Sequence, residues 1–224
     1  MLLSEIIDEN RGILDDRVPP YLWSDKDLAG CVNRTINDLC IKAKIIIDST
    51  TADICTISVV SGTKDYLYDP RIIEIKRARL YSQSYPLRKR SVYYLDNHKV
   101  GWESDSDGTP VMYLIDKTTG YITLHPTPSA DDSLLLTVAR LPLVRLSDED
   151  MSAIPEIPAQ YHNDIYDGIL GYAYSKQDSE TFDPIKAERY KAMWKQKIFE
   201  ITNDMLINNS VDTNIDPNPD YMDE

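Results

Sequence analysis

The residues of this chain that could perform metal or acid–base chemistry are few and widely spaced. The histidines are His98, His125 and His162, and no pair has the His-x-x-x-His spacing that places two metal ligands on one helix face. The cysteines form no Cys-x-x-Cys pair, and neither a glycine-rich dinucleotide fingerprint nor a phosphate-binding loop is present. The sequence therefore predicts no catalytic residue, no metal site and no cofactor.

One polar segment has part of the pattern of a calcium-binding loop. Glu103, Asp105, Asp107 and Gly108 have the right residue types, but the twelfth position, where a bidentate Glu is needed, is Leu114. We interpret the segment as a polar surface loop. A carboxylate pair that hydrolyses a substrate remains an alternative, because separation in space cannot be read from sequence. Among 37 acidic residues such pairs also arise by chance.

The net charge of the chain is −13, from 37 acidic and 24 basic residues, and a surface of that charge repels nucleic acid. Basic residues are nevertheless concentrated between positions 71 and 90. Six of them, which we call the basic belt, are Lys76, Arg77, Arg79, Arg88, Lys89 and Arg90. The belt predicts a contact between copies of the chain or with a charged partner, and an ordinary solvated surface is the alternative. Because Tyr81, Tyr85 and Tyr93 are interleaved with it, a grip on a nucleic acid strand is a further alternative.

The last seventeen residues, 208–224, form an acidic tail without a basic residue. Fixing the backbone of this tail would cost about 17–34 kcal/mol, at about 1–2 kcal/mol per residue. Its four apolar side chains, worth about 1.5–3 kcal/mol each when fully buried, cannot offset that cost. We predict that the isolated tail is disordered and becomes ordered on another chain, with packing on its own subunit as the alternative. The tail residues predicted to bind a partner are Val211, Asp212, Ile215, Asp216, Asp220, Tyr221 and Met222.

The N-terminal segment predicts two helices joined by a stiff connector. Residues 2–16 carry apolar side chains at helical spacing, and the Pro19-Pro20 pair ends that helix. Ser24 followed by Asp27 resembles a capping box, with Asp in place of the usual Glu. A long helix is therefore expected over about 25–47.

The middle of the chain predicts strands. Residues 51–60 alternate and are rich in β-branched side chains, and further strands are expected at 66–68 and within 69–82. The segments 111–116 and 121–126 flank a turn and read as a hairpin. A last strand is predicted within 134–143. Residues 83–110 are expected to be irregular.

The C-terminal part predicts a helical hairpin, with helices over about 159–176 and 184–206. Asp183 is placed to cap the second helix and Pro184 to occupy its first position. The expected fold class is α+β, in which N-terminal and C-terminal helical hairpins pack together, with an inserted, mostly antiparallel β unit and an extended tail. The expected boundaries are 1–50, 51–150, 151–207 and 208–224.

Cysteine usage and hydropathy indicate the compartment. Cys31, Cys40 and Cys55 are an odd set without paired spacing, which predicts buried, reduced thiols. No run of about 18 apolar residues is present, so no membrane span is expected. The acidic N-terminus lacks the basic lead of a signal peptide, and we expect a soluble protein that is not exported.

Three stretches of the sequence resemble the head-to-tail adaptor proteins of tailed bacteriophages, especially short-tailed ones. They are VPPYLWSDKDL, DPRIIEIKRARL and PEIPAQYHNDIYDGILGYAYSKQDSETFDPIKAERY, and together they extend across most of residues 1–206. The third is the most specific. The resemblance implies a virion protein without catalytic residues that forms a ring, commonly of twelve copies, under the portal, after assembly in the host cytoplasm. It also implies that the ring extends the DNA channel and offers a platform for the tail nozzle or tail fibres, and that the tail grips the portal.

Three function classes follow from these observations. The leading one is a structural adaptor, through whose channel DNA passes without specific binding. The first alternative is a protein that binds DNA, or retains its terminus, at the same vertex. The second alternative is a carboxylate-dependent hydrolase, which the sequence does not require.

Overall fold

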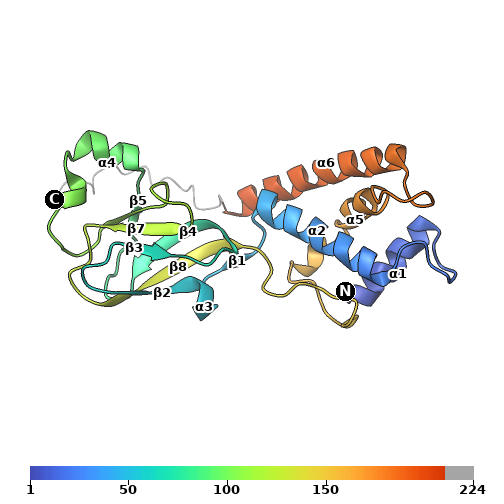
Figure 1. Ribbon diagram of the computed structural model, residues 1–224, viewed down its shortest axis with the longest axis horizontal. Coiled ribbons are helices and arrows are strands. Elements are labelled where there is room, and N and C mark those ends of the chain that lie inside the picture. The colour runs from blue at the N-terminus through green and yellow to red at the C-terminus, as the bar shows by residue number, and fades with distance from the viewer. Residues whose placement is uncertain (210–224) are drawn as a thin grey trace. The chain divides into compact units, whose positions relative to one another are not determined.

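A computed structural model describes residues 1–209 of the chain, and they divide into two compact units (Figure 1). The helical unit contains Met1–Ile45 together with the chain from Val144 onward. The β unit contains the intervening segment Ile46–Leu143. The helices of the first unit and the antiparallel sheets of the second confirm the expected α+β class.

The N-terminal helices of the helical unit are α1 (Leu3–Leu14) and α2 (Asp25–Ala43). The capping box at the start of α2 is confirmed, because the Asp27 N–H donates to Ser24 Oγ at 3.1 Å and the Ser24 N–H donates to an Asp27 carboxylate oxygen at 3.3 Å. One apolar stripe of α2 is buried. Its buried members include Leu28, Val32, Ile36, Leu39 and Ala43.

The predicted end of α2 near residue 47 was wrong. Lys44 adopts a left-handed conformation (φ 53°, ψ 44°) and its N–H donates to the Cys40 carbonyl, which ends the helix. The next residues then enter the β unit, where Ile47 and Asp48 pair with the last strand. Apolar periodicity continues through this point, so the pattern alone could not show the change of backbone conformation.

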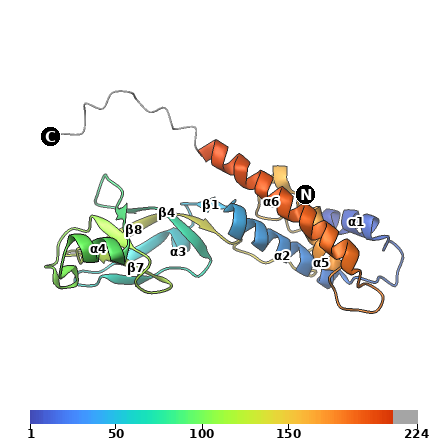
Figure 2. The ribbon, with the colours of Figure 1, turned by 90° about the horizontal axis from the view of Figure 1, so that it is seen from above.

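The C-terminal hairpin contains α5 (Tyr166–Ala173) and α6 (Pro184–Asn209). Both N-terminal helices pack against α5, and α2 also contacts α6 (Figures 1 and 2). The Lys186 N–H donates to Asp183 Oδ1 at 3.0 Å, which confirms Asp183 as the N-cap of α6. The inner face of α6 buries four residues. They are Ala187, Trp194, Ile198 and Ile201.

The first helix of that hairpin is shorter than the predicted 159–176. A separate 3-10 turn occupies Ala159–Tyr161, and regular helix begins only at Tyr166. His162 lies in the break, where its ring contacts the Ile157 carbonyl and the amino group of Met1, both at 3.0 Å. The contact with the chain's other end, 161 residues away, cannot be seen in local periodicity.

The β unit contains two four-stranded sheets. In the first, β8 (Asp132–Arg140) pairs antiparallel with three strands. They are β1 (Ile47–Asp48), β2 (Thr56–Val59) and β4 (Ile72–Leu80). The second has the order β3-β7-β6-β5. Its strands are β3 (Asp65–Leu67), β7 (Tyr121–His125), β6 (Met112–Leu114) and β5 (Arg88–Lys89). The β6–β7 pair confirms the predicted hairpin, and Gly120 supplies its positive φ of 82°.

Two local predictions in this unit were wrong. Residues 52–55 form a helical turn, α3 (Ala52–Cys55), where the alternating pattern predicted a strand. The Asp48 carboxylate holds the chain there by accepting from the Thr50 and Thr51 N–H groups at 2.8 and 3.2 Å. The segment expected to be irregular contains β5 and α4 (Val92–His98), whose N-cap is Ser91.

Candidate interaction surfaces

The polar residues first considered for chemistry have structural roles. His125 is buried, its Nε2 lies 3.2 Å from Asp105 Oδ2, and burial lowers its pKa although Asp105 opposes that shift. His98 stacks on Tyr94 with ring centroids 4.2 Å apart. Within residues 1–209, no three His, Cys, Asp or Glu side chains are grouped so that they could hold a metal ion. In the same range no helix is long and apolar enough to cross a bilayer.

The cysteines match their predicted state. Cys31, Cys40 and Cys55 are all buried, and none of the three forms a disulfide. Burial raises the pKa of the Cys31 thiol to about 11, so this group is a thiol and not a nucleophilic thiolate near neutral pH.

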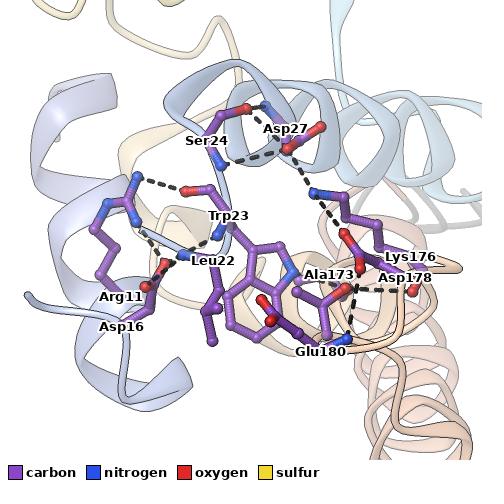
Figure 3. A network of polar contacts seen from close by, with 11 residues as sticks. Arg11, Asp16, Leu22, Trp23, Ser24, Asp27, Ala173, Lys176, Asp178 and Glu180 are labelled. Atoms are coloured by element: carbon purple, nitrogen blue, oxygen red, sulfur yellow. Dashed lines mark hydrogen bonds and ion pairs between the residues drawn. The ribbon is translucent and has the colours of Figure 1, made fainter. Parts of the chain in front are cut away.

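The first stretch that resembles adaptor proteins folds into a network of buried polar contacts (Figure 3). The Arg11 guanidinium pairs with Asp16 at 2.7 Å, and both side chains are at most 5% exposed. The same guanidinium donates to the Trp23 carbonyl at 2.8 Å and reaches Asp25 at 2.7 Å. Asp16 in turn accepts from the N–H groups of Leu22 and Trp23. These bonds fix the connector between α1 and α2.

This network connects the N-terminal helices to the C-terminal hairpin. Trp23 Nε1 donates to the Ala173 carbonyl at 3.0 Å, and Lys176 pairs with Asp27 at 3.0 Å (Figure 3). Burial alone would raise the pKa of the Asp27 carboxyl group, but Lys176 and Ser24 outweigh burial and hold it below its ordinary value. The first and third of the stretches that resemble adaptor proteins are therefore in contact with each other, at the turn that precedes α6.

The basic belt lies on two strands of the β unit. Lys76, Arg77 and Arg79 are on β4, and Arg88 and Lys89 form β5. The Leu87 N–H donates to the Ala78 carbonyl at 2.8 Å, which brings the two halves of the belt together.

The belt residues differ in how firmly they are held. Lys76 Nζ lies 3.6 Å from Glu74 Oε2. The Arg79 side chain donates to the Gln83 carbonyl at 2.7 Å. The Arg90 guanidinium lies 4.7 Å from the Tyr94 ring centroid. The exposed side chains of Arg77 and Arg88 have no hydrogen-bond or ion-pair partner within residues 1–209. These two positive charges are therefore available to another molecule.

The predicted tail contacts, Val211 to Met222, fall outside the residues that the structure describes. One surface was missed by the sequence analysis. The side of α6 that faces away from α5 exposes large apolar residues, including Ile185 (82% exposed), Phe199 (66%) and Leu206 (61%). Their seven-residue spacing was visible in the sequence.

A family model described as SU10 adaptor protein matches residues 1–217 of the chain. The chain belongs to this family. No curated protein sequence matches it. The SU10 adaptor match spans both units and confirms the resemblance inferred from the three stretches. The protein is thus a bacteriophage adaptor protein, which is a structural class of viral protein.

Proposed function

We propose that this adaptor protein forms a ring beneath the phage portal, extends the DNA channel and provides a docking platform for the tail nozzle or tail fibres. The match to the SU10 adaptor family over residues 1–217 carries the proposal. A ring of twelve copies in the virion, assembled in the host cytoplasm, is the form we expect. The acidic tail, with Val211, Asp216 and Tyr221 among its contacts, would bind the portal or a neighbouring copy.

The charge of the protein supports a channel role. DNA must pass such a ring without binding, and an acidic lumen repels a polyanion. The chain carries a net charge of −13. The basic belt is then a local exception that would face an acidic surface of a neighbour or of the portal, because a closed ring needs one surface that complements a different one.

Charge reversal tests the role of the belt. The Arg77→Glu/Arg88→Glu variant changes two exposed side chains without known partners, so folding should be retained. We expect few or no rings when this variant is mixed with a portal ring and imaged in negative stain. The Lys26→Glu/Arg34→Glu variant makes the same change in charge on exposed positions of α2 and should still form rings. Normal rings from the belt variant would contradict the role of the belt.

DNA binding at the same vertex is the second candidate, and one observation favours it. Tyr81, Tyr85 and Tyr93 are 72–80% exposed in the segment that carries the belt, where they could stack on bases. A gel-shift series with single-stranded and double-stranded DNA separates the two functions. The adaptor function predicts that any binding seen at low salt is lost at physiological salt. Binding that persists there and weakens in a Tyr81→Ala/Tyr85→Ala variant would favour the second candidate.

A further inference from the structure

Helix α6 is apolar on two opposite faces. Its inner face packs Ala187, Trp194 and Ile198 into the helical unit, and these residues are at most 6% exposed. On the far side, positions 185, 192, 199 and 206 follow one another at intervals of seven. With the adjacent Ile207, they form what we call the outer face of α6: Ile185, Ala192, Phe199, Leu206 and Ile207. A helix with apolar residues on both sides is typical of a helix that is covered on both sides.

A second exposed apolar patch belongs to the same unit. It is formed by the end of α1 and the connector to α2, and we call it the corner patch: Ile13, Val18, Tyr21 and Leu22. These four side chains are 42–78% exposed. The connector is held rigidly by the Arg11–Asp16 network, and the Arg11 guanidinium lies 3.7 Å from the Tyr21 ring centroid. The patch is therefore presented on a fixed backbone.

The charges around the two patches are mixed, but their balance differs in sign. Next to the outer face of α6, the exposed Arg189, Lys195 and Asp204 have no ion-pair partner in the described chain, whereas Glu188 and Glu200 each lie near a lysine. The exposed charges on α1 and at its C-cap are acidic. They are Glu5, Asp8, Glu9 and Asp15. Two exposed basic residues, Arg17 and Lys26, lie beside the corner patch, and the Arg17 side chain lies against Gly12 of α1.

Both patches belong to the helical unit, which is one compact body. When one surface of a body binds a different surface of the next copy, the association is head-to-tail, and it closes into a ring when the rotation allows.

We propose that the outer face of α6 binds the corner patch of a second copy of this chain, and that this contact is repeated from copy to copy. The proposal rests on the proposed ring and assigns the surface that forms it. The 26-residue helix is about 39 Å long, and a strip about 10 Å wide along it covers about 400 Å². A stable interface buries about 800 Å² on each partner. A single contact is therefore weak, and cross-linking suits it better than isolation of a complex.

Cysteine cross-linking with a short bismaleimide tests the assignment. The native cysteines are buried, so introduced thiols should react selectively. Phe199→Cys and Val18→Cys place one thiol on each patch. We expect the double variant to give a ladder of dimers, trimers and larger species. We expect a mixture of the two single variants to give heterodimers and stop there, because each copy then carries one reactive patch. The control pair combines Phe199→Cys with Val100→Cys and measures random collisions. Val100 lies in the β unit and is 95% exposed.

The proposal predicts that cross-linking is at least tenfold faster than in the control pair. It also predicts that this difference is lost when Leu206→Asp is added to the Phe199→Cys chain. Two outcomes would overturn it: a rate equal to that of the control pair, or Phe199→Cys homodimers forming as fast as heterodimers, which would indicate symmetric α6–α6 pairing. Imaging the unmodified protein with a portal ring separates this assignment from the ring itself. Rings without cross-linking would mean that another surface joins the copies, whereas no rings would contradict the proposed function.

Discussion

The helical unit and the β unit each contain one buried arginine–aspartate pair, but the two pairs hold different kinds of structure. In the helical unit, Arg11 and Asp16 are five residues apart and fix a local connector. In the β unit, Asp48 and Arg140 are 92 residues apart, and their 2.7 Å contact joins the unit's first strand to its last. The first pair fixes the conformation of an exposed connector, whereas the second holds together the strands that begin and end the β unit.

The surfaces of the two units differ in the same way. The helical unit exposes apolar side chains on α6 and at the corner patch, which suits contact with a second copy. The β unit exposes a basic belt, which suits a charged partner. Under the two proposals above, contact with a second copy and contact with a charged partner would be divided between the units.

The largest effect is expected from breaking each buried pair. Arg11→Met and Arg140→Met each leave an aspartate buried without its charge partner, which costs about 3–5 kcal/mol. Hydrogen exchange measured by mass spectrometry should show lost protection in the helical unit for the first variant and in the β unit for the second. Arg71→Met breaks the more exposed Arg71–Asp69 pair and should have a much smaller effect, because water screens an exposed ion pair. Equal loss in both units from either variant would mean that the units are not independent.

Alanine substitutions at two helical glycines should change the stability of the helical unit in opposite directions. A Cβ added at Gly168 would clash with a Thr35 methyl group and lie 2.9 Å from the Trp194 ring. Gly168→Ala should therefore destabilise the unit by about 1–3 kcal/mol. A Cβ at Gly30 meets no atom within 4 Å, so Gly30→Ala should stabilise α2 by about 0.5–1 kcal/mol. Urea denaturation would measure both changes, and a neutral Gly168→Ala would show that Trp194 can move.

The N-cap of α6 should contribute about 1 kcal/mol. Asp183→Ala removes the acceptor of the Lys186 N–H, whereas Asp183→Asn retains an acceptor oxygen and serves as the control. The loss should be seen in urea midpoints and confined to the helical unit. If the Ala and Asn variants were equally stable, the bond would carry no net stabilisation.

Smaller still should be the change in stability between pH 3 and pH 7, whose sign distinguishes the two units. Burial raises the pKa of Asp167 in α5, so its contribution is favourable at low pH and is lost as the pH rises through the folded-state value. Burial would also raise the pKa of Asp48, but bonds from Thr51, Thr50 and Arg140 hold it well below 3.8. Its contribution is present above that value and lost as the pH falls below it.

Asp167→Asn should therefore stabilise the helical unit at pH 7 and have no favourable effect near pH 3. Asp48→Asn should destabilise the β unit at pH 7, and its cost should shrink on acidification. Thermal melts of both variants across pH 3–7 would measure the two trends. Parallel trends would contradict the opposite directions of the two pKa shifts.

Local sequence determined the features that depend on neighbouring residues. The capping box of Ser24 and Asp27, the Asp183 cap and the β6–β7 hairpin are set by groups at most a few residues apart. The buried state of the cysteines was predicted from their odd number and lack of paired spacing. The three stretches also identified the adaptor family, which the match over residues 1–217 confirmed.

Only the tertiary structure decided where α2 ends, why residues 52–55 turn and how the belt is arranged. The first two depend on partners far along the chain, which are β8 for Ile47 and Arg140 for Asp48. The third depends on the contact that Leu87 makes with Ala78 across a loop. Both apolar faces of α6 were present in the sequence. Which of them is buried and which is exposed is known only once the positions of the neighbouring helices are known. The physical reason is that caps and turns are satisfied by adjacent groups, whereas strand pairing and exposure are set by segments that folding alone brings together.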